Sequence, residues 1–428
     1  MTQSSKSGTE RLLGYDLARS LAILGMMLVH FSLVMSMTQI HSGWLGKVID
    51  LLDGRAAATF LVVAGAGLTL ISRRAVASGD PVKTGSVRRL VLRRGVFLLL
   101  CGFLNLLIWP GDILRVYGLS FILASAFLGA SGRWLWQWSV FFAVGFVVLL
   151  LLFDYEQNWD WTTLTYHNLW TPLGALRNLF YDGFRAVFPW AGLLFFGMWL
   201  GRHDLKQPVT RRKFLCWGIG LVTVSHLCSA TLLGYFQNYP NGLNAEEITA
   251  VFGTESMPPM PLFLLSGLGA AITVIALSFG IVEQWGSAKL VQSLVATGQM
   301  AFTWYVAHLV IGLGTVFALG WTGTVPLWIA FTTGTGFFLL AMWLSSAWKR
   351  HFRNGPLETL LRWWSDAARL SPTRTPLILC LLIVIFLVIV ISTPPNSLLS
   401  EPTNSVLSLT HDSQRPGPRQ LMEPEVSG

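Results

Sequence analysis

Histidines inside long apolar runs are the side chains of this sequence best suited to chemistry. His30, His226 and His308 each lie in a stretch that is otherwise apolar. An imidazole can gain or lose a proton near pH 7, and an ionisable group at membrane depth is costly enough to indicate function. The three histidines could meet in one cavity. Each could instead simply hydrogen-bond a neighbouring helix, and we favour that alternative for His226, whose polar companions are Ser225 and Ser229.

A second group of candidate residues lies between the first two apolar runs. It contains His41, Trp44, Asp53 and Arg55. A histidine beside carboxylates at the mouth of a helix bundle can act as a general base at neutral pH. A solvated loop with Asp53 as a helix cap explains the same residues, and the loop taken alone favours this simpler interpretation.

In two acid–base pairs the partners are three residues apart, and each pair lies where a helix is predicted to begin. Asp16 and Arg19 open the first run, while Asp112 and Arg115 lie at the start of the fourth and are followed by Tyr117. This spacing puts both partners on one helix face, so each pair can form an ion pair. Arg19 could bind a phosphate-bearing donor or anchor its helix at the membrane edge, and the spacing favours the anchor.

Several common catalytic motifs are absent from the sequence. It contains no GxxxxGKS loop, no GxSxG, no HExxH and no Cys/His set with metal-ligand spacing. We therefore predict no metal site, and we expect neither an ATP-driven pump nor a soluble hydrolase. The four cysteines all lie in apolar runs and form no CxxC pair: Cys101, Cys216, Cys228 and Cys380.

The composition indicates that membrane helices position these residues. Of 428 residues, 53% are hydrophobic and 12% are charged, whereas a soluble domain has about 25% charged residues. This excludes soluble globular, coiled-coil and disordered classes and predicts an all-α, polytopic membrane helix bundle. Because roughly 20 apolar residues cross a bilayer as a helix, we predict about eleven spans. They are 17–38, 56–72, 94–110, 114–131, 134–153, 187–201, 214–236, 260–282, 292–319, 326–346 and 376–392.

The basic residues predict which side of the membrane each loop faces. With a cytoplasmic N-terminus, 23 of the 30 Lys and Arg fall on the cytoplasmic side and 7 on the outer side. Basic loops stay on the side from which a chain is inserted, so this asymmetry predicts the N-terminus inside. The same asymmetry explains the net charge of +9, so the charge does not indicate binding to nucleic acid. The outer segments hold 14 of the 21 Asp and Glu, which suits a neutral or cationic substrate.

We expect three parts along the chain. Residues 1–365 form the helical bundle, and residues 366–392 carry an additional C-terminal transmembrane helix. Residues 393–428, rich in Pro and Ser, form a disordered tail on the outer side. No cleavable signal peptide is evident, so the first apolar run is predicted to be a span.

Short motifs along most of the chain resemble one membrane family. Residues 11–25, which begin Arg-Leu-Leu-Gly-Tyr-Asp-Leu-Ala-Arg, are similar to the R-x-x-x-x-D-x-x-R-G-x-A-x-x-G opening of the bacterial family catalogued as domain of unknown function 418. So are the G-D-I-L-x-x-Y of residues 111–117, the Phe-Pro-Trp segment of residues 188–202, and the Gly-Pro-Leu-Glu segment of residues 355–362. The family looks related to heparan-alpha-glucosaminide N-acetyltransferase, in the transmembrane acyltransferase superfamily.

The resemblance implies transfer of an acyl group from cytoplasmic acetyl-CoA, or another acyl-CoA, to an acceptor on the far side. By position, the active histidine of these relatives corresponds to His41, followed by Trp44. A second histidine in a Tyr-Val-Gly-His setting corresponds to His308, after Tyr305. Most members carry Asn where this chain has His30, a departure that changes the chemistry of the site.

The leading hypothesis from the sequence is therefore transmembrane acyl transfer in the inner cell membrane. His41 would deprotonate the acceptor, or carry the acyl group, while His308 or Asp53 would position or polarise it. Asp16, Arg19 and the basic block at 88–94 would bind the donor. Further substrate-binding or donor-binding candidates are His30, Trp44, Arg55, Asp112, Arg115, Tyr117, Trp190 and Tyr305. Expected partners are membrane lipids and an envelope glycan or lipid acceptor, with no nucleic acid, and a homodimer is allowed for.

Two alternatives stay open. The chain could be a transporter for a small solute, with the buried histidines as a proton relay. It could also be an assembly partner in envelope synthesis with no chemistry of its own.

Overall fold

The computed structural model describes residues 12–36, 43–160, 165–238 and 244–366. Three predictions fall outside these residues: His41, the span 376–392 and the tail 393–428.

The described part of the chain is built almost entirely of helices, which confirms the predicted all-α class. The strands within it are β1 (Trp159–Asp160) and β2 (Thr165–Tyr166), two residues each and antiparallel. The α-helices are α1 (Leu13–Met35), α2 (Gly43–Leu52), α3 (Arg55–Ala77), α4 (Pro81–Asn105), α5 (Leu114–Ala126), α6 (Gly132–Leu152), α7 (Pro172–Arg177), α8 (Val187–Leu200), α9 (Pro208–Asn238), α10 (Ala245–Phe252), α11 (Pro261–Trp285), α12 (Lys289–Gly298), α13 (Ala301–Ala307), α14 (Gly314–Ala318), α15 (Leu327–His351) and α16 (Pro356–Ser365). Two π-helical segments are η1 (Asn178–Asp182) and η2 (His308–Leu313).

Helix starts follow ordinary capping chemistry. Asp80 accepts from the backbone N–H groups of Val82 and Lys83 at the start of α4. Asn244 and Glu247 form a reciprocal capping box at the start of α10. These side chains satisfy N–H groups that have no partner within the helix, which fixes where the helix begins.

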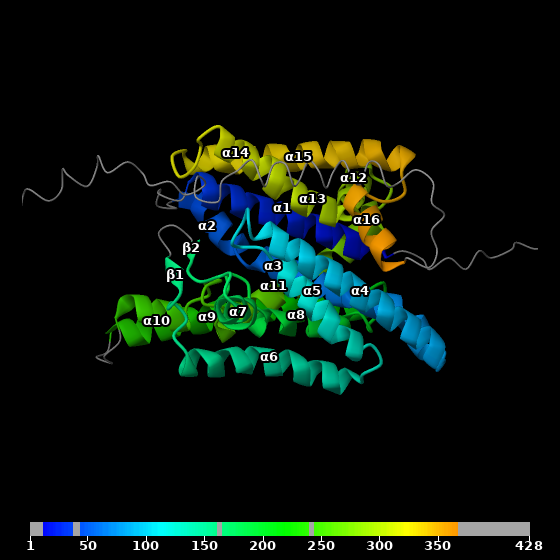
Figure 1. Ribbon diagram of the computed structural model, residues 1–428, viewed down its shortest axis with the longest axis horizontal. Helices are drawn as coiled ribbons and strands as arrows, with labels where there is room; N and C mark the ends of the chain where they lie inside the picture. Colours follow the sequence, from blue (N-terminus) through cyan, green and yellow to red (C-terminus); the bar gives the residue numbers. More distant parts are fainter. Residues whose placement is uncertain (1–11, 37–42, 161–164, 239–243, 367–428) are drawn as a thin grey trace, which may run out of the picture.

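The long helices run side by side and form a layered bundle (Figure 1). In the most apolar 18-residue stretch of each helix, 72% of the residues of α1 and 61% of those of α11 are buried, against 17% in both α6 and α9. The exposed faces of α6, α9 and α15 still carry large apolar side chains. Apolar helices exposed at the rim of a bundle are expected where lipid is the solvent.

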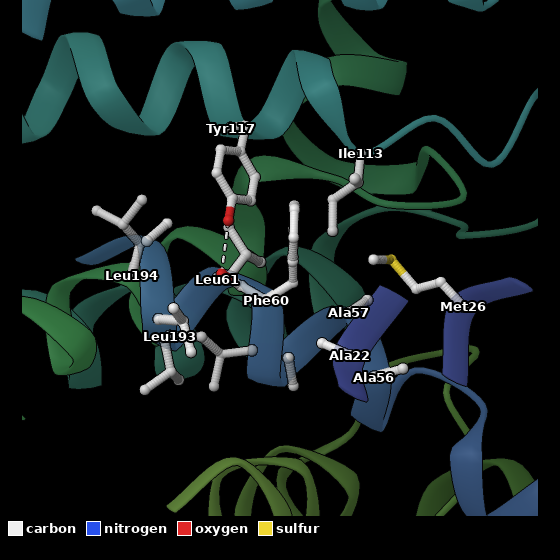
Figure 2. Packing of buried hydrophobic residues seen from close by; sticks show 14 of the residues in the cluster. Ala22, Met26, Ala56, Ala57, Phe60, Leu61, Ile113, Tyr117, Leu193 and Leu194 are labelled. Carbon is white, nitrogen blue, oxygen red and sulfur yellow. Dashed lines mark hydrogen bonds between the residues drawn. The ribbon is translucent and has the colours of Figure 1, made fainter. Parts of the chain in front are cut away.

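Small side chains let the central helices approach closely. A Cβ on Gly197 of α8 would lie 2.1 Å from the carbonyl oxygen of Val62, so α3 and α8 touch backbone to backbone there. Figure 2 shows Ala22, Ala56 and Ala57 in the same packed core, where the Tyr117 hydroxyl donates to the Phe60 carbonyl at 2.5 Å. Small residues at helix contacts are typical of membrane bundles.

The predicted number of spans is not confirmed. Within the described residues, seven helical stretches are long and apolar enough to cross a membrane, and the bent pair formed by residues 172–182 and 187–200 would make eight. α4 falls short because Lys83 and several arginines occupy its first half. α5 has 13 residues and is too short by itself.

The bundle has two ends, the α2 end and the α16 end. The α2 end carries α2, α10 and the two strands, and the α16 end carries α12, α16 and the start of α4 (Figure 1).

Candidate functional site

Two of the predicted histidines meet inside the bundle. His30 of α1 and His308, the first residue of η2, have ring nitrogens Nδ1 and Nε2 only 2.9 Å apart. The His308 side chain is buried and the His30 side chain partly so. The ring of Trp109 lies 5.1 Å from the ring of His30. A π-helical turn such as η2 frequently marks a functional position, because it departs from the regular helical hydrogen-bond pattern.

The hydrogen bonds assign the protons of this histidine pair. His308 Nδ1 lies 3.1 Å from the carbonyl oxygen of Trp304. A carbonyl only accepts, so Nδ1 of His308 carries the proton and its Nε2 is a lone pair. That lone pair accepts from Nδ1–H of His30. In the neutral pair, Nε2 of His30 is therefore unprotonated and can act as a base.

A small pocket lies beside His30 at the α2 end. Its polar lining comes from His30, Asp53, Arg185 and Tyr305, and its free volume is about 20 Å³. That is enough for one small polar group. An ion pair at 3.5 Å joins Asp53 to Arg185, and Ser256 donates its hydroxyl to Asp53 at 2.5 Å. The pocket thus combines a base with a fixed cation–carboxylate pair.

Glycine shapes the rim of this pocket. Gly54 has φ +67° and immediately precedes α3. A Cβ there would come within 2.6 Å of Ser256 and 2.5 Å of Phe263. Both the backbone conformation and the space favour glycine, and Gly54 orients Asp53 and Arg55 on its two sides.

A buried network holds Tyr305, which also lines the pocket. The Tyr305 hydroxyl donates to Asp112 at 3.2 Å and accepts from the backbone N–H of Ile113 at 3.2 Å. Asp112 also accepts from the side chain of Asn105 at 2.7 Å. Asp112 lies in the connection between α4 and α5, outside the helical spans, and burial raises its pKa to about 6, although Arg115 and the hydrogen bonds oppose the rise.

The predicted contact between Asp112 and Arg115 takes a different form. Asp112 accepts from the backbone N–H of Arg115 at 3.1 Å, whereas the guanidinium of Arg115 donates to Asn178 at 2.5 Å. Asn178 begins η1, so Arg115 joins α5 to the segment before α8. Residues spaced three apart can form an ion pair, but Arg115 instead bonds Asn178, which is 63 residues away in the sequence.

The idea that all three histidines share a cavity is wrong. His226 of α9 lies 3.4 Å from the guanidinium of Arg55 and 3.4 Å from the hydroxyl of Ser266. This cluster, Arg55–His226–Ser266, joins α3, α9 and α11. His226 bonds neighbouring helices, as the simpler interpretation expected, but its polar partners come from other parts of the chain.

The donor-binding candidates lie at the α16 end. Arg19 donates to Asp16 at 2.9 Å and to the carbonyl oxygen of Gly298 at 3.3 Å, and Gln299 donates to Asp16 at 3.1 Å. The predicted pairing of Asp16 with Arg19 is confirmed. Gln299 also lines a cavity of about 190 Å³ that includes Lys349.

The remaining candidates are distributed unevenly. Trp190 lies beside the site, because the guanidinium of Arg185 stacks 4.7 Å above its ring. The Tyr117 hydroxyl already donates its hydrogen bond to the carbonyl oxygen of Phe60. Trp44 is 71% exposed on α2 and does not line the pocket beside His30.

Sequence reasoning missed Arg185, Trp109 and Asn105 as members of the site. Arg185 lies three residues before the Phe-Pro-Trp motif that resembles the family, but its position in the sequence does not show that it reaches this pocket. The indole N–H of Trp109 is buried without a hydrogen-bond partner in the described part of the chain. It lies 2.6 Å from the Cβ position of Gly111, a residue that lines the pocket. A lone indole carries no signal of this kind in the sequence.

Comparisons with known proteins match two family descriptions to two parts of the chain. Residues 11–240 match the family described as "Heparan-alpha-glucosaminide N-acetyltransferase, catalytic". Residues 245–368 match the family described as "Protein of unknown function (DUF418)". The chain is also 27% identical over 400 residues to the uncharacterized protein YeiB of Escherichia coli (strain K12), in an alignment covering 82% of this chain and 96% of YeiB.

Proposed function

The chain belongs to the family described as heparan-alpha-glucosaminide N-acetyltransferase, catalytic, and from that premise we propose that it is a transmembrane acyltransferase. It takes an acyl group, acetyl in the simplest case, from cytoplasmic acyl-CoA and transfers it to a sugar or lipid-linked acceptor on the outer face. In this proposal the protein lies in the inner cell membrane with the α16 end in the cytoplasm and the α2 end outside.

One observation carries the proposal: the hydrogen-bonded histidine pair beside the pocket of the α2 end. His308 fixes the ring of His30 through the 2.9 Å contact and leaves Nε2 of His30 as the base. Asp53 and Arg185 border the same pocket. A base held in one orientation next to a small polar pocket is what deprotonation of an acceptor hydroxyl or amine requires.

The transfer step uses these groups as follows. The acceptor gives its proton to Nε2 of His30, and its oxygen or nitrogen attacks the thioester carbonyl carbon. The new C–O or C–N bond forms, the C–S bond breaks, and the coenzyme A thiolate leaves and takes up the proton from the imidazolium. Negative charge develops on the carbonyl oxygen, where the indole N–H of Trp109 would stabilise it.

The α16 end is the proposed donor side. Lys349 lines the cavity of about 190 Å³ there. Arg19 is linked to the same lining because Asp16 accepts from both Arg19 and Gln299. Cations of this kind bind coenzyme A phosphates. Eleven residues of α1 separate Arg19 from His30, about 16 Å along the helix axis. The thioester arm must cover that distance.

The test is acetyl transfer by the purified protein. Wild type is incubated with labelled acetyl-CoA and a panel of sugar and lipid-linked acceptors, beside His30→Gln and His41→Ala. We expect transfer by wild type and its loss in His30→Gln. Transfer that is lost only in His41→Ala would give the base role to His41, as the resemblance implies. No labelled product from any acceptor would reject the acyltransferase proposal.

A second candidate function is proton-coupled transport of a small solute. The direct contact between two buried histidines favours it, because such a pair can pass a proton. Vesicles containing the protein but no acyl donor distinguish the two functions. Uptake of protons and solute that depends on His308 would favour transport, and its absence favours the enzyme.

A further inference from the structure

A second cavity, distinct from the histidine pocket, opens on the side of the bundle. It measures about 480 Å³ and lies between α1, α2, α3, α9 and α11. Its walls are almost entirely apolar and include Leu24, Leu28, Ile219 and Val274. This volume is within the range typical of small-molecule sites.

The position of the cavity along the helices places it at membrane depth. It follows α1 from Leu21 to Leu28 and α11 from Ala270 to Val274, near the middle of both helices. Ile219 on α9 is 51% exposed, so the cavity is open between helices at the side of the bundle. In a bilayer that side faces hydrocarbon.

The cavity adjoins the histidine pocket. Leu52 and Ala56 line both spaces, so one wall separates them. A molecule with an apolar chain in the large cavity could therefore place its polar end beside His30.

The polar atoms of the cavity are arranged unevenly. The hydroxyls of Thr59 and Thr273 donate to carbonyl oxygens of their own helices, so neither hydroxyl needs a ligand. Arg55 is the charged residue in the lining. Its guanidinium donates to the carbonyl oxygens of Asp50 and Thr254, each at 3.1 Å.

Arg55 forms no direct ion pair among the described residues, although the carboxylates of Asp50 and Asp53 stabilise its charge from a greater distance. Its third donor bonds the hydroxyl of Ser266 at 3.0 Å, and no carboxylate lies within ion-pair distance among the described residues. Arg55 is 5% exposed. The excess of Asp and Glu in the outer segments suits a neutral or cationic substrate in general. No carboxylate of the described chain contacts this buried guanidinium, however, so an anionic ligand can pair with it directly, and phosphate matches its geometry well.

We propose that the large cavity binds the hydrocarbon chain of a phosphate-bearing lipid, with the phosphate at Arg55. Resting on the acyltransferase function proposed above, this lipid is the acceptor, and its hydroxyl or amine reaches His30 past Leu52 and Ala56. The proposal narrows the acceptor from a sugar or lipid-linked group to a lipid-linked group.

The first experiment tests binding without any acyl transfer. The full-length protein in phosphatidylcholine nanodiscs is photolabelled with hexadecyl phosphate that carries a diazirine in the chain, and with the matching hexadecyl trimethylammonium. We expect labelling in α1, α9 and α11 around the cavity, about tenfold stronger for the phosphate, since a charge-assisted hydrogen bond contributes at least that factor. Arg55→Gln should remove the preference. Equal labelling by both probes in wild type would overturn the phosphate assignment.

A matched pair of variants tests the cavity itself. Thr223 lines it and Val224 does not, and both are exposed neighbours on α9. Thr223→Trp should reduce cavity labelling about tenfold by occupying the opening, whereas Val224→Trp should leave labelling unchanged. Ile219→Trp serves if Thr223→Trp does not fold. Undiminished labelling in the filled variants would overturn the proposal.

The second experiment separates this inference from the proposed function. Transfer from labelled acetyl-CoA is measured with one acceptor headgroup on a long chain and on a short, soluble chain. Thr223→Trp should lose transfer to the long-chain acceptor and keep transfer to the short one. Equal loss for both acceptors would reject the lipid-chain role. If wild type transfers to neither acceptor, the acyltransferase and the acceptor role of the lipid both fail, and the labelling result alone decides whether the cavity binds lipid.

Discussion

The two ends of the bundle hold their ionisable side chains in different ways. At the α16 end, Glu358 accepts from the backbone N–H groups of Phe302 and Thr303, at 2.8 and 3.1 Å, and from the Thr303 hydroxyl at 2.6 Å. Asp16 is similarly occupied by Arg19 and Gln299. These contacts join α13 to α16, and α1 to the residue that follows α12, and they account for both carboxylates as parts of the structure.

At the α2 end, some polar atoms near the pocket lack a hydrogen-bond partner in the described part of the chain. Nε2 of His30 and the indole N–H of Trp109 have no hydrogen-bond partner within the described ranges. Both side chains are brought together by α1 and the α4–α5 connection, beside a pocket. The hydroxyls of Ser20 and Ser278, nearer the α16 end, are also buried without a partner among the described residues. A buried polar group without a partner costs free energy, and the position of His30 and Trp109 beside the pocket indicates that this part of the α2 end is arranged for a ligand, whereas the two carboxylates of the α16 end serve the structure.

The largest effect is expected from breaking the histidine pair. His308→Gln removes the imidazole that orients His30, and general-base catalysis typically contributes 10²–10⁴-fold, so acetyl transfer should fall by about 10²-fold or more. His203→Gln is the matched control, since His203 packs against Trp199 and Phe214 and lines neither the histidine pocket nor the cavity at Arg55. Initial rates with saturating acetyl-CoA measure both. Equal losses in the two variants would mean that the α2-end pair has no special role.

The indole of Trp109 gives the next largest effect. Trp109→Phe keeps the ring but removes the N–H, and loss of one oxyanion donor costs about 10²-fold in turnover. Trp138→Phe is the control, because Trp138 also has an indole N–H without a partner but lies on α6 among aromatic rings.

The expected signature for Trp109→Phe is a fall in kcat with KM nearly unchanged, since the donor acts on charge that develops in the transition state. A change of KM alone would instead assign Trp109 to binding.

The sequence predicted the helices better than it predicted the site. The span predicted at 187–201 corresponds to α8 (Val187–Leu200), and the one at 326–346 to α15 (Leu327–His351). Hydrocarbon thickness sets the length of an apolar helix, so such segments can be identified locally. The i,i+3 pair Asp16–Arg19 was predictable for the same reason.

The contacts of the site depend on packing between distant segments. His30 and His308 are 278 residues apart, and Tyr305 reaches Asp112 across 193 residues. Which turn of α1 faces which turn of η2 follows from small residues such as Gly298, whose Cβ would collide with the Asp16 carbonyl oxygen at 1.8 Å. Such register is not encoded in the spacing of any one helix, which is why Arg185 was missed.

Glu358, at the α16 end, should affect stability rather than chemistry. Glu358→Ala removes the acceptor of three hydrogen bonds and should lower the free energy of unfolding by about 2 kcal/mol. Glu283→Ala is the control, because Glu283 is 54% exposed and its ion pair with Arg211 contributes about 0–1 kcal/mol. Thermal unfolding in detergent measures both variants. The comparison of the two ends would be broken if Glu358→Ala lowered the transfer rate per folded molecule.

The smallest effect expected is a pH dependence that originates at Asp112. With its pKa raised to about 6 by burial, the carboxyl is ionised at neutral pH and accepts from Tyr305 and Asn105. Below about pH 6 it takes up a proton, loses an acceptor site, and loosens Tyr305, so transfer should fall a few-fold. The raised pKa means that the folded state binds this proton more tightly than the unfolded state does. Acid therefore stabilises the fold through Asp112, so protonation of this carboxyl does not itself cause unfolding. Asp112→Asn keeps one acceptor oxygen at every pH, so its rate should lack this fall between about pH 7 and pH 5; an identical fall in wild type and Asp112→Asn would assign the pH dependence to the histidine pair.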